Sequence, residues 1–491
     1  MFNFLLSEAA RLANAITVGK NRMTDEEYIV KEINSFKISK RRNDMLNGEK
    51  YYAGIHDILS KVRTIIGENG DLEEVKNLPN NRIVDNQYKK MVDQKNNYLL
   101  GQPISVQCEN KQYVKLLKKV FNKKFQRLIK SVGEDSLNCG IGWVFVNYDE
   151  HGKITFKRLK PFEIIPLWKD AEHTILDGAI RIYEVVAYEG RQEKVIQKVE
   201  VYDDNGITFF ELSDGGRLTP VEPFVQNYFT ITHEDGTETG YNWTKIPLIP
   251  FKYNNKEIPL IKMVKSLQDG LNVILSNFQN NMEEDTRNTI LVLKNYDGQK
   301  LGEFRKNLAA YGAVKVRTVD GADGGVETLT IEVNAENYKA IIEIFKKAII
   351  ENAMGYDAKD DRLNGNPNQM NIQSMYSDID LDANNMETEY QASFEELLWF
   401  INCHFANMGL GDFEDEEVEI IFNRDILISE NEVIDNCHKS VGILSDETLV
   451  AQHPWVDDPE AEMKRLKKQK ETEMDMYGDF GQSSKKDGDT E

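Results

Sequence analysis

Cysteine is scarce in this chain of 491 residues, and the four that are present form no Cys-x-x-Cys pair: Cys108, Cys139, Cys403 and Cys437. Such isolated thiols are typical of a reduced, cytosolic setting and argue against a disulfide framework. No apolar run approaches the roughly eighteen residues that span a bilayer, so we expect no membrane partner. The short apolar stretch at the N-terminus has no basic residue before it, so we expect no secretory signal.

Sequence motifs for common catalytic sites are also missing. The chain contains no GxxxxGKS/T loop for phosphates, no GxSxG nucleophile elbow and no HExxH zinc motif. Cys403-His404 and Cys437-His438 offer the residue types that bind zinc. Two adjacent side chains do not easily bind one metal, however, and ordinary thiols and histidines are the favoured interpretation. The sequence therefore predicts neither an enzyme nor a cofactor.

Three pairs of adjacent acids leave one enzymatic alternative open. Two-metal nucleases hold their ions between carboxylates that converge from separate elements. Asp203-Asp204 lies in a predicted hairpin turn and Asp457-Asp458 at a predicted helix start, so a structural role explains both pairs. Asp360-Asp361 lies in a polar loop, where a metal role stays open. The alternative function is therefore a metal-dependent DNA-processing enzyme.

Acidic residues outnumber basic ones by 82 to 60, which gives a formal net charge of −22. Proteins that bind DNA tightly neutralise its phosphates with Lys and Arg, so this excess argues against tight DNA binding over most of the surface. The acids are unevenly placed, with ten in residues 411–435 against Arg424 alone.

Two stretches are locally basic. Residues 111–130 carry eight Lys and Arg and no acid, a pattern typical of a solvated face, of a phosphate-tracking surface or of an anionic membrane contact, and we favour the solvated face. Residues 299–319 carry five basic residues against Glu303, and residues 320–336 carry only acidic charges. Adjacent stretches of opposite sign suit a contact between unlike subunit faces, and a solvated hairpin is an equally good interpretation.

Hydrophobic periodicity predicts helices first and strands next. Within residues 81–103, apolar positions recur every three or four residues from Val84 to Leu99, with Lys95 on the same stripe by its aliphatic stem. Gly101 and Pro103 end that helix, and residues 111–130 form a second one. The period changes to two between about 140 and 255. Hairpins are expected over 143–159 and over 199–212, the latter around a primed turn at Asn205-Gly206.

The remaining elements are mainly helical. Amphipathic helices over 260–288 and from 338 onward bracket an insert with a strand (289–293), a short helix (299–311) and a hairpin (313–318 with 326–332). A polar loop, 355–367, precedes residues 368–408, which contain no Gly or Pro and keep one apolar stripe. Residues 429–480 are expected to be helical, and 481–491 to be disordered. The fold class is α+β.

The order of these segments resembles a known family. The segments that carry the likeness are residues 81–103, residues 259–354, the loop 355–367 with the long helix after it, and residues 445–462. Together with the stretches between them they cover nearly the whole chain, in the order found in the SPP1-type portal proteins of tailed bacteriophages. The similarity to that family rests on the order of all these segments, since none of them is catalytic or unique by itself.

The resemblance implies a portal-type elongated ring subunit with long stem and spine helices, a β-rich wing and a small α/β clip. By position, the implied parts are the wing (1–255), the first stem helix (256–288), the clip (289–334), the second stem helix (335–354), the tunnel loop (355–367), the spine helix and its connection (368–428), the helical crown (429–480) and the disordered tail (481–491).

The resemblance also implies a function and partners. Twelve subunits would form a homo-oligomeric ring at one capsid vertex, and double-stranded DNA would pass through its channel during packaging and ejection. The implied protein partners are the large terminase, a head-tail connector or adaptor, and the major capsid and scaffolding proteins. The ring would assemble in the bacterial host cytoplasm and become part of the virion. A virion structural protein that forms no ring is a further alternative.

Two groups of residues are expected to act in that ring. In the tunnel loop, DNA contacts are expected from Lys359, Arg362, Asn364 and Asn366. In the clip, contacts with terminase or a neighbouring subunit are expected from Lys300, Arg305, Lys306, Lys315 and Arg317. A channel through which DNA slides should not hold phosphates tightly, so the net charge of −22 argues against tight DNA binding rather than against DNA as a partner.

Overall fold

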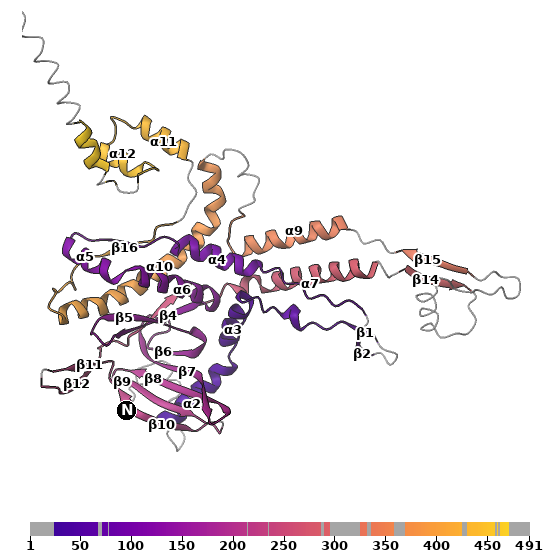
Figure 1. Cartoon of the computed structure of the whole chain (residues 1–491), viewed down its shortest axis with the longest axis horizontal. Coiled ribbons are helices and arrows are strands. Elements are labelled where there is room, and N and C mark those ends of the chain that lie inside the picture. Colours follow the sequence, from indigo (N-terminus) through magenta and orange to yellow (C-terminus); the bar gives the residue numbers. More distant parts are fainter. Residues whose placement is uncertain are drawn as a thin grey trace, which may run out of the picture. The chain divides into compact units, whose positions relative to one another are not determined.

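The computed structural model describes residues 24–66, 71–76, 78–213, 215–233, 235–285, 289–294, 325–330, 335–357, 369–424, 430–456, 459 and 462–470. It has the mixed helix and sheet content expected of an α+β fold. The chain divides into two compact units (Figure 1). The first contains residues 1–355 and 382–424, and the second contains residues 356–381 and 425–491. Among the described residues, no helix is both long enough and apolar enough to cross a lipid bilayer.

Helices dominate the N-terminal part of the first unit. Their bounds are α2 (Asp25–Ile38), α3 (Lys40–Tyr52), α4 (Gln87–Leu100), α5 (Lys111–Val120) and α6 (Lys123–Cys139). Side-chain caps fix where the first two begin, with a Thr24–Glu27 capping box at α2 and the Ser39 hydroxyl at α3. A 3-10 turn and a small hairpin follow α3: η2 (Asp57–Ser60), β1 (Thr64–Ile66) and β2 (Leu72–Glu74).

The helix expected from Val84 begins later than predicted. α4 starts at Gln87, after the N-cap Asn86, whose Oδ1 accepts a hydrogen bond from Lys89 N at 2.9 Å. The residues before it, and Tyr88 in its first turn, are bound by side chains of α7 (Ile261–Asp285). The bonds run from Asn81 N to Asn280 Oδ1 (2.7 Å), Ile83 N to Ser276 Oγ (2.9 Å), Asp85 N to Asn272 Oδ1 (3.1 Å) and Tyr88 N to Gln268 Oε1 (2.9 Å).

This side-chain ladder, formed by Gln268, Asn272, Ser276 and Asn280, has a geometric origin. Its members are spaced by four residues, so each advances about 6 Å along α7. The amides of residues 81, 83 and 85 are spaced by two, which advances about 6.6 Å in an extended chain. The two repeats nearly match, and all four ladder side chains are buried. The helix thus binds an extended segment, and this long-range contact overrides the helical pattern at Val84.

Replacing Ser276 by alanine should destabilise the ladder by about 1–3 kcal/mol, because Ile83 N–H loses its acceptor in a buried place. Amide hydrogen exchange of residues 79–86 should therefore become faster. Ser377→Ala is the matched control, since that exposed hydroxyl donates to Ser374 O within its own helix. Equal protection of residues 79–86 in Ser276→Ala and in the unmodified protein would contradict this account.

The prediction of a single helix over residues 111–130 is wrong, because α5 and α6 are separate helices. The chain leaves the helical conformation at Phe121, whose ψ is 52°. Asn122 then caps α6, with its Oδ1 accepting from Lys124 N at 2.8 Å and from Phe125 N at 3.3 Å. The expectation that the apolar side docks on the strands is confirmed by Phe125, whose ring lies 5.3 Å from that of Phe156.

Antiparallel sheets form the middle of the first unit. A three-stranded sheet has the order β13-β4-β5, with β4 (Ile141–Tyr148), β5 (Ile154–Leu159) and β13 (Leu248–Lys252), and it confirms the hairpin over 143–159. After η3 (Pro161–Glu163), a five-stranded sheet has the order β10-β9-β8-β7-β6, with β6 (Ile164–Trp168), β7 (Leu176–Glu189), β8 (Gln192–Asp203), β9 (Gly206–Leu212) and β10 (Leu218–Gln226). Two further strand pairs are β11 (Phe229–Thr232) with β12 (Glu238–Tyr241), and β3 (Ser105–Gln107) with β16 (Glu419–Ile421).

The tight turn between β8 and β9 is confirmed, but its type differs from the prediction. Asp203 pairs with Gly206, so Asp204 and Asn205 are the two central residues. A primed turn of the Asn-Gly kind needs positive φ at both central positions, and here only the following Gly206 has it, at 121°. Asp203 Oδ1 accepts from Asn205 N at 2.8 Å, which gives this acidic pair a structural role.

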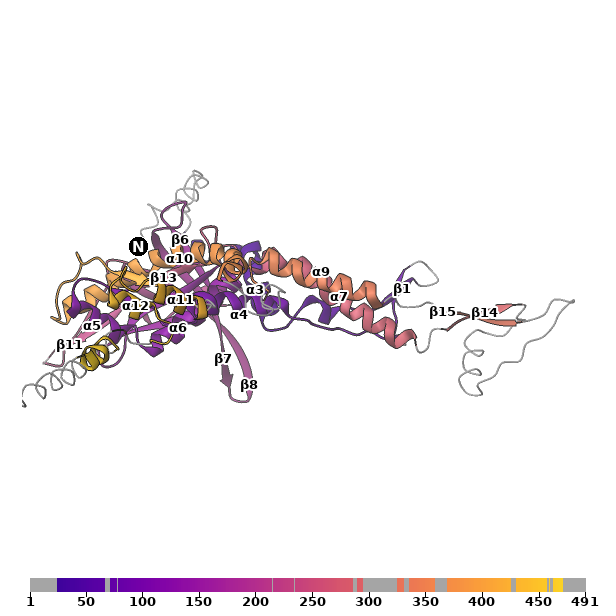
Figure 2. The same ribbon diagram turned by 90° about the horizontal axis from the view of Figure 1, so that it is seen from above.

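The two amphipathic helices around the insert are confirmed. α7 and α9 (Ala335–Asn352) run side by side in both views (Figure 1, Figure 2). They approach closely because α7 has a glycine at the contact: a Cβ on Gly270 would lie 2.5 Å from Phe345 Cε1. β14 (Thr289–Lys294) follows α7 and pairs antiparallel with β15 (Gly325–Thr330). The elements expected at 299–311 and 313–318 lie outside the described residues.

The long helix expected after the polar loop is confirmed as α10 (Gln369–Asn407), which belongs to the first unit from Asp382 onward. There its apolar stripe packs on β13 and α6. The Tyr390 ring lies 5.0 Å from the Phe251 ring, and the Tyr390 hydroxyl lies 2.9 Å from Ser136 Oγ. This packing joins α10 to the sheet core.

The second unit contains the expected C-terminal helices. They are α11 (Glu430–Lys439), α12 (Asp446–Gln452) and a further helical stretch over 462–470. Ser445 caps α12 by accepting from Thr448 N at 3.3 Å. The tail expected to be disordered, 481–491, lies outside the described residues.

Candidate functional site: the Lys95 anchor

The site residues predicted from the sequence fall outside the part of the chain that the structure describes. This holds for Lys359, Arg362, Asn364 and Asn366 in the loop, for Lys300, Arg305, Lys306, Lys315 and Arg317 in the insert, and for the acidic pairs at 360–361 and 457–458. The structure does describe the two points that flank residues 356–381, which contain most of the loop. The chain leaves the first unit after Gly355 and re-enters it at Asp382.

The first of these points is the C-terminal end of α9. Gly355 N donates to Ile350 O at 2.9 Å, and Met354 N donates to Glu351 O at 3.0 Å, which closes the last turn. Met354 has a backbone φ of 51°, a conformation that residues other than glycine rarely adopt. Gly355 lies against α4, where an added Cβ would approach Met91 Sδ to 2.7 Å. The chain therefore leaves the first unit through a tightly fitted position.

Lys95 of α4 joins both points. Its side chain is only 3% exposed, and its Nζ lies 2.6 Å from Asp382 Oδ2 and 3.1 Å from Met354 O. Tyr253 completes the group by donating from its hydroxyl to Asp382 Oδ1 at 2.8 Å. Burial, with the Asp382 carboxylate as a second cause, raises the pKa of Tyr253 well above its ordinary value, so the phenol stays a donor.

This Lys95 anchor (Lys95, Tyr253, Met354 and Asp382) fixes the positions from which residues 356–381 extend. A buried ion pair is costly to break because the remaining partner is left as an uncompensated buried charge. The polar groups of the anchor bond to one another and to the backbone at Met354, so the anchor positions the chain.

The sequence contains a signal for this site. The apolar stripe of residues 81–103 includes Lys95, and that pattern predicts a buried aliphatic stem. The structure buries the ammonium group as well, which requires a counter-ion. Nothing in the sequence identifies Asp382 as that counter-ion, because it lies 287 positions away.

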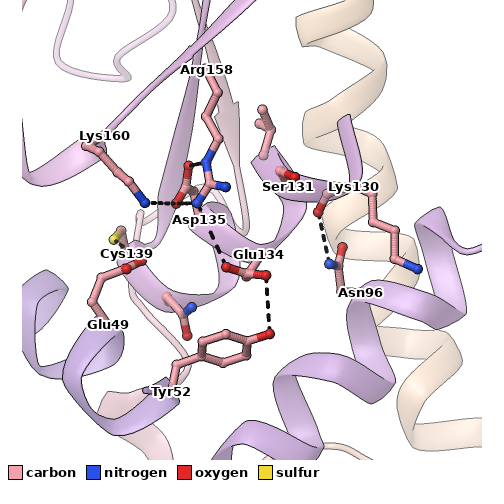
Figure 3. Close-up of polar contacts among 12 residues, drawn as sticks. Glu49, Tyr52, Asn96, Lys130, Ser131, Glu134, Asp135, Cys139, Arg158 and Lys160 are labelled. Atoms are coloured by element: carbon pink, nitrogen blue, oxygen red, sulfur yellow. Dashed lines mark hydrogen bonds and ion pairs between the residues drawn. The ribbon is translucent and has the colours of Figure 1, made fainter. Parts of the chain in front are cut away.

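A second buried ion pair joins α6 to β5 (Figure 3). Arg158 makes a two-pronged contact with Asp135, with Nη2 at 2.5 Å from Oδ1 and Nε bonded to Oδ2. Glu134 lies at the edge of the pair, 3.8 Å from Arg158 and 3.2 Å from the Tyr52 hydroxyl. Asp135 is fully buried, and this burial raises its pKa to about 6, although the Arg158 guanidinium acts in the opposite direction.

Metal-binding arrangements are absent from the described ranges. No group of three or more His, Cys, Asp or Glu side chains there could hold a metal ion. All four cysteines are free. His404 packs its ring 5.4 Å from that of Tyr148, and burial lowers its pKa. Aromatic packing therefore explains His404 without zinc.

Most of the chain matches known proteins. Residues 37–476 match the family model for phage portal proteins described as SPP1 Gp6-like. The chain is 29% identical over 439 residues to the portal protein of Bacillus phage SPP1, which covers 89% of this chain and 84% of that protein. It is 28% identical over 454 residues to the portal protein of Clostridium phage phiCD119, which covers 89% of this chain and 95% of that protein. The chain belongs to the SPP1 Gp6-like family of phage portal proteins.

Proposed function

We propose that twelve copies of this portal protein form a ring at one capsid vertex and that double-stranded DNA passes through its channel during packaging and ejection. The observation that carries the proposal is the family match over residues 37–476. The order of elements supports it, since α7 and α9 pack together and bracket the β14–β15 pair, and α10 follows. Such a ring is part of the virion and assembles in the host cytoplasm.

The parts of the subunit follow from the same proposal. Residues 1–255 form the wing, 256–288 and 335–354 the two stem helices around the clip at 289–334, and 355–367 the tunnel loop. Residues 368–428 form the spine helix with its connection, 429–480 the crown, and 481–491 the disordered tail. The pairing of α7 with α9 supports the stem, and the strands β14 and β15 support the clip.

The chain lacks a GxxxxGKS/T loop for ATP, so the packaging motor must be a separate protein. In this proposal the large terminase docks on the clip, where Lys300, Arg305, Lys306, Lys315 and Arg317 contact either terminase or the neighbouring subunit. The head-tail connector, the major capsid protein and the scaffolding protein are the other partners.

The tunnel loop is proposed to touch DNA through Lys359, Arg362, Asn364 and Asn366. The Lys95 anchor supports this role, because it gives the loop a fixed starting point at Gly355. Asp360 and Asp361 lie between the two basic residues and weaken the hold on phosphates.

Neutralising the loop with Lys359→Gln and Arg362→Gln together should lower the packaging efficiency of the phage or its retention of packaged DNA, because the moving DNA loses its weak phosphate contacts. A plaque assay and a nuclease-protection assay on the particles measure the two effects. Lys153→Gln with Lys157→Gln, two exposed changes in the β4–β5 hairpin, is the matched control. Packaging and retention that equal those of the control would contradict the role of the loop.

Size-exclusion chromatography with light scattering tests the ring itself. The proposal expects the mass of about twelve subunits. The two alternatives predict different outcomes: a DNA-processing enzyme cleaves DNA when Mg²⁺ or Mn²⁺ is added, and another virion structural protein forms no closed ring.

A further inference from the structure

Two surfaces of the first unit carry charge of opposite sign that the described residues do not neutralise. The first is the basic face of α5 and α6, formed by Lys111, Lys115, Lys118, Lys119, Lys123, Lys124, Arg127 and Lys130. All eight side chains are exposed, and within the described residues none of them forms a salt bridge. The opposite sides of both helices are buried through Tyr113, Leu117, Phe125 and Ile129, so the helices are fixed to the core without using their basic face.

The second surface is an open acidic groove of about 2060 Å³ formed by α10, residues 107–113, residues 241–245 and residues 412–419. Nine carboxylates line it: Glu109, Glu395, Glu396, Asp412, Glu414, Asp415, Glu416, Glu417 and Glu419. Lys245 is the one cation among its lining residues. In the described structure none of the nine carboxylates has a salt-bridge partner.

Three features of the groove favour an occupant with cationic and other polar groups. Lys245 Nζ lies 4.8 Å from the centre of the Trp399 ring, which shows that an ammonium group fits over an indole of this groove. Burial raises the pKa of Glu396, although Lys245 and Lys252 act in the opposite direction. Trp243, which is 5% exposed, also lines the groove, and its Nε1–H has no hydrogen-bond partner among the described residues.

The two surfaces point in different directions on one subunit. Tyr113 of α5 lines the groove, and at about 100° per residue the four lysines of that helix lie about 140° to 240° around the axis from it. The α5 lysines of a subunit therefore lie on the side of the helix away from its own groove. A subunit can offer the basic face to one neighbour and the groove to another, which is the arrangement that closes a ring of identical subunits.

We propose that the acidic groove of one subunit binds the α5–α6 basic face of the next copy of this chain. The inference rests on the proposed ring and names the surfaces that close it. A second copy fits better than DNA as the occupant of the groove, because DNA is repelled by its nine carboxylates. It also accounts for both unneutralised surfaces with a single repeated contact. The contact is electrostatic, so it weakens as salt concentration rises.

Charge reversal on each surface, and on both together, tests the contact in the full-length protein. The acidic variant is Glu414→Lys with Glu417→Lys, and the basic variant is Lys118→Glu with Lys119→Glu; all four positions are exposed. Mass photometry at physiological salt should show a ring fraction at least about tenfold lower in each variant, because like charges then face each other. The combined variant should recover rings, because the exchanged charges attract again across every contact.

Lys153→Glu with Lys157→Glu is the matched control for the basic variant, because it makes the same change of charge at two exposed residues that belong to neither the groove lining nor the basic face. Circular dichroism of every variant checks that the subunit is folded. If the unmodified protein forms rings and either reversal forms as many, the proposed contact is wrong and the ring stands. A combined variant that assembles no better than the single reversals also overturns it, as does a basic variant that loses only DNA binding. Unmodified protein without rings would instead overturn the proposed function.

Discussion

Replacing Lys95 by methionine should lower the free energy of unfolding of the first unit by about 3–5 kcal/mol at pH 7. The loss arises because Asp382, which is only 8% exposed, would become a buried charge without a counter-ion. It would keep the hydrogen bond from Tyr253 but lose the Lys95 ammonium group, which lies 2.6 Å away. Met354 O would lose its contact with Lys95 as well. Thermal unfolding measures the loss, and amide hydrogen exchange at the end of α9 and around Asp382 should show where the structure loosens.

Lys90→Met is the matched control for this change. Lys90 lies on the same helix but is exposed, so its replacement should change the free energy of unfolding by less than about 0.5 kcal/mol. A double variant with Lys95→Met and Asp382→Leu removes both charges and should recover part of the stability. If Lys95→Met is as stable as Lys90→Met, the ion pair does not anchor the loop.

Replacing Arg158 by methionine should destabilise the protein by about 3 kcal/mol at pH 8 and by clearly less at pH 5. Asp135 has a folded-state pKa raised to about 6, above its ordinary value of 3.8, and without Arg158 that pKa rises further. A raised carboxyl pKa means that the folded state binds more protons, so the contribution of Asp135 is present at low pH and is lost as pH rises through the folded-state pKa. At pH 5 the carboxyl of the variant is therefore neutral, and no unpaired charge is buried.

Unfolding of the unmodified protein and of Arg158→Met, measured at both pH values, gives the comparison. Adding Asp135→Asn to Arg158→Met should abolish the pH dependence of the difference, because the titrating carboxyl is gone. An equal loss of stability at pH 5 and pH 8 in Arg158→Met would show that Asp135 does not titrate as the geometry requires.

Local pattern predicts the long helices well. α7, α9 and α10 each keep an apolar stripe over many residues, and their positions agree with the periodicity of the sequence. The hairpin of β4 and β5 was predictable for the same reason, since alternation and a polar turn are both local. These elements need no information from distant parts of the chain.

The predictions of helix boundaries fail where a polar side chain binds backbone amides that a helix would otherwise use. Asn122 divides the helix expected over residues 111–130, because its side chain binds the amides that a continuous helix would use. Residues 81–85 are held by polar side chains of α7, about 190 positions along the chain, and no local pattern identifies that contact. The sequence shows polar residues spaced by four in α7, namely Gln268, Asn272, Ser276 and Asn280. It does not show which segment of the chain these residues bind.

The candidate site was predictable only in part. A lysine on an apolar stripe marks a buried cation, yet its partner comes from α10, which is distant in the sequence. The acid-rich stretch 411–435 was also visible, and the structure gathers part of it with acids of α10 and residue 109 into one groove. Convergence of segments far apart in the chain is a tertiary property, and composition alone does not reveal it.

Electron microscopy of the purified full-length protein tests the central claim most directly. The account predicts closed rings of about twelve subunits with a central hole, and a reconstruction in which residues 355–367 face that hole. Compact monomers or dimers without a channel would contradict the proposed ring and, with it, the role assigned to the tunnel loop.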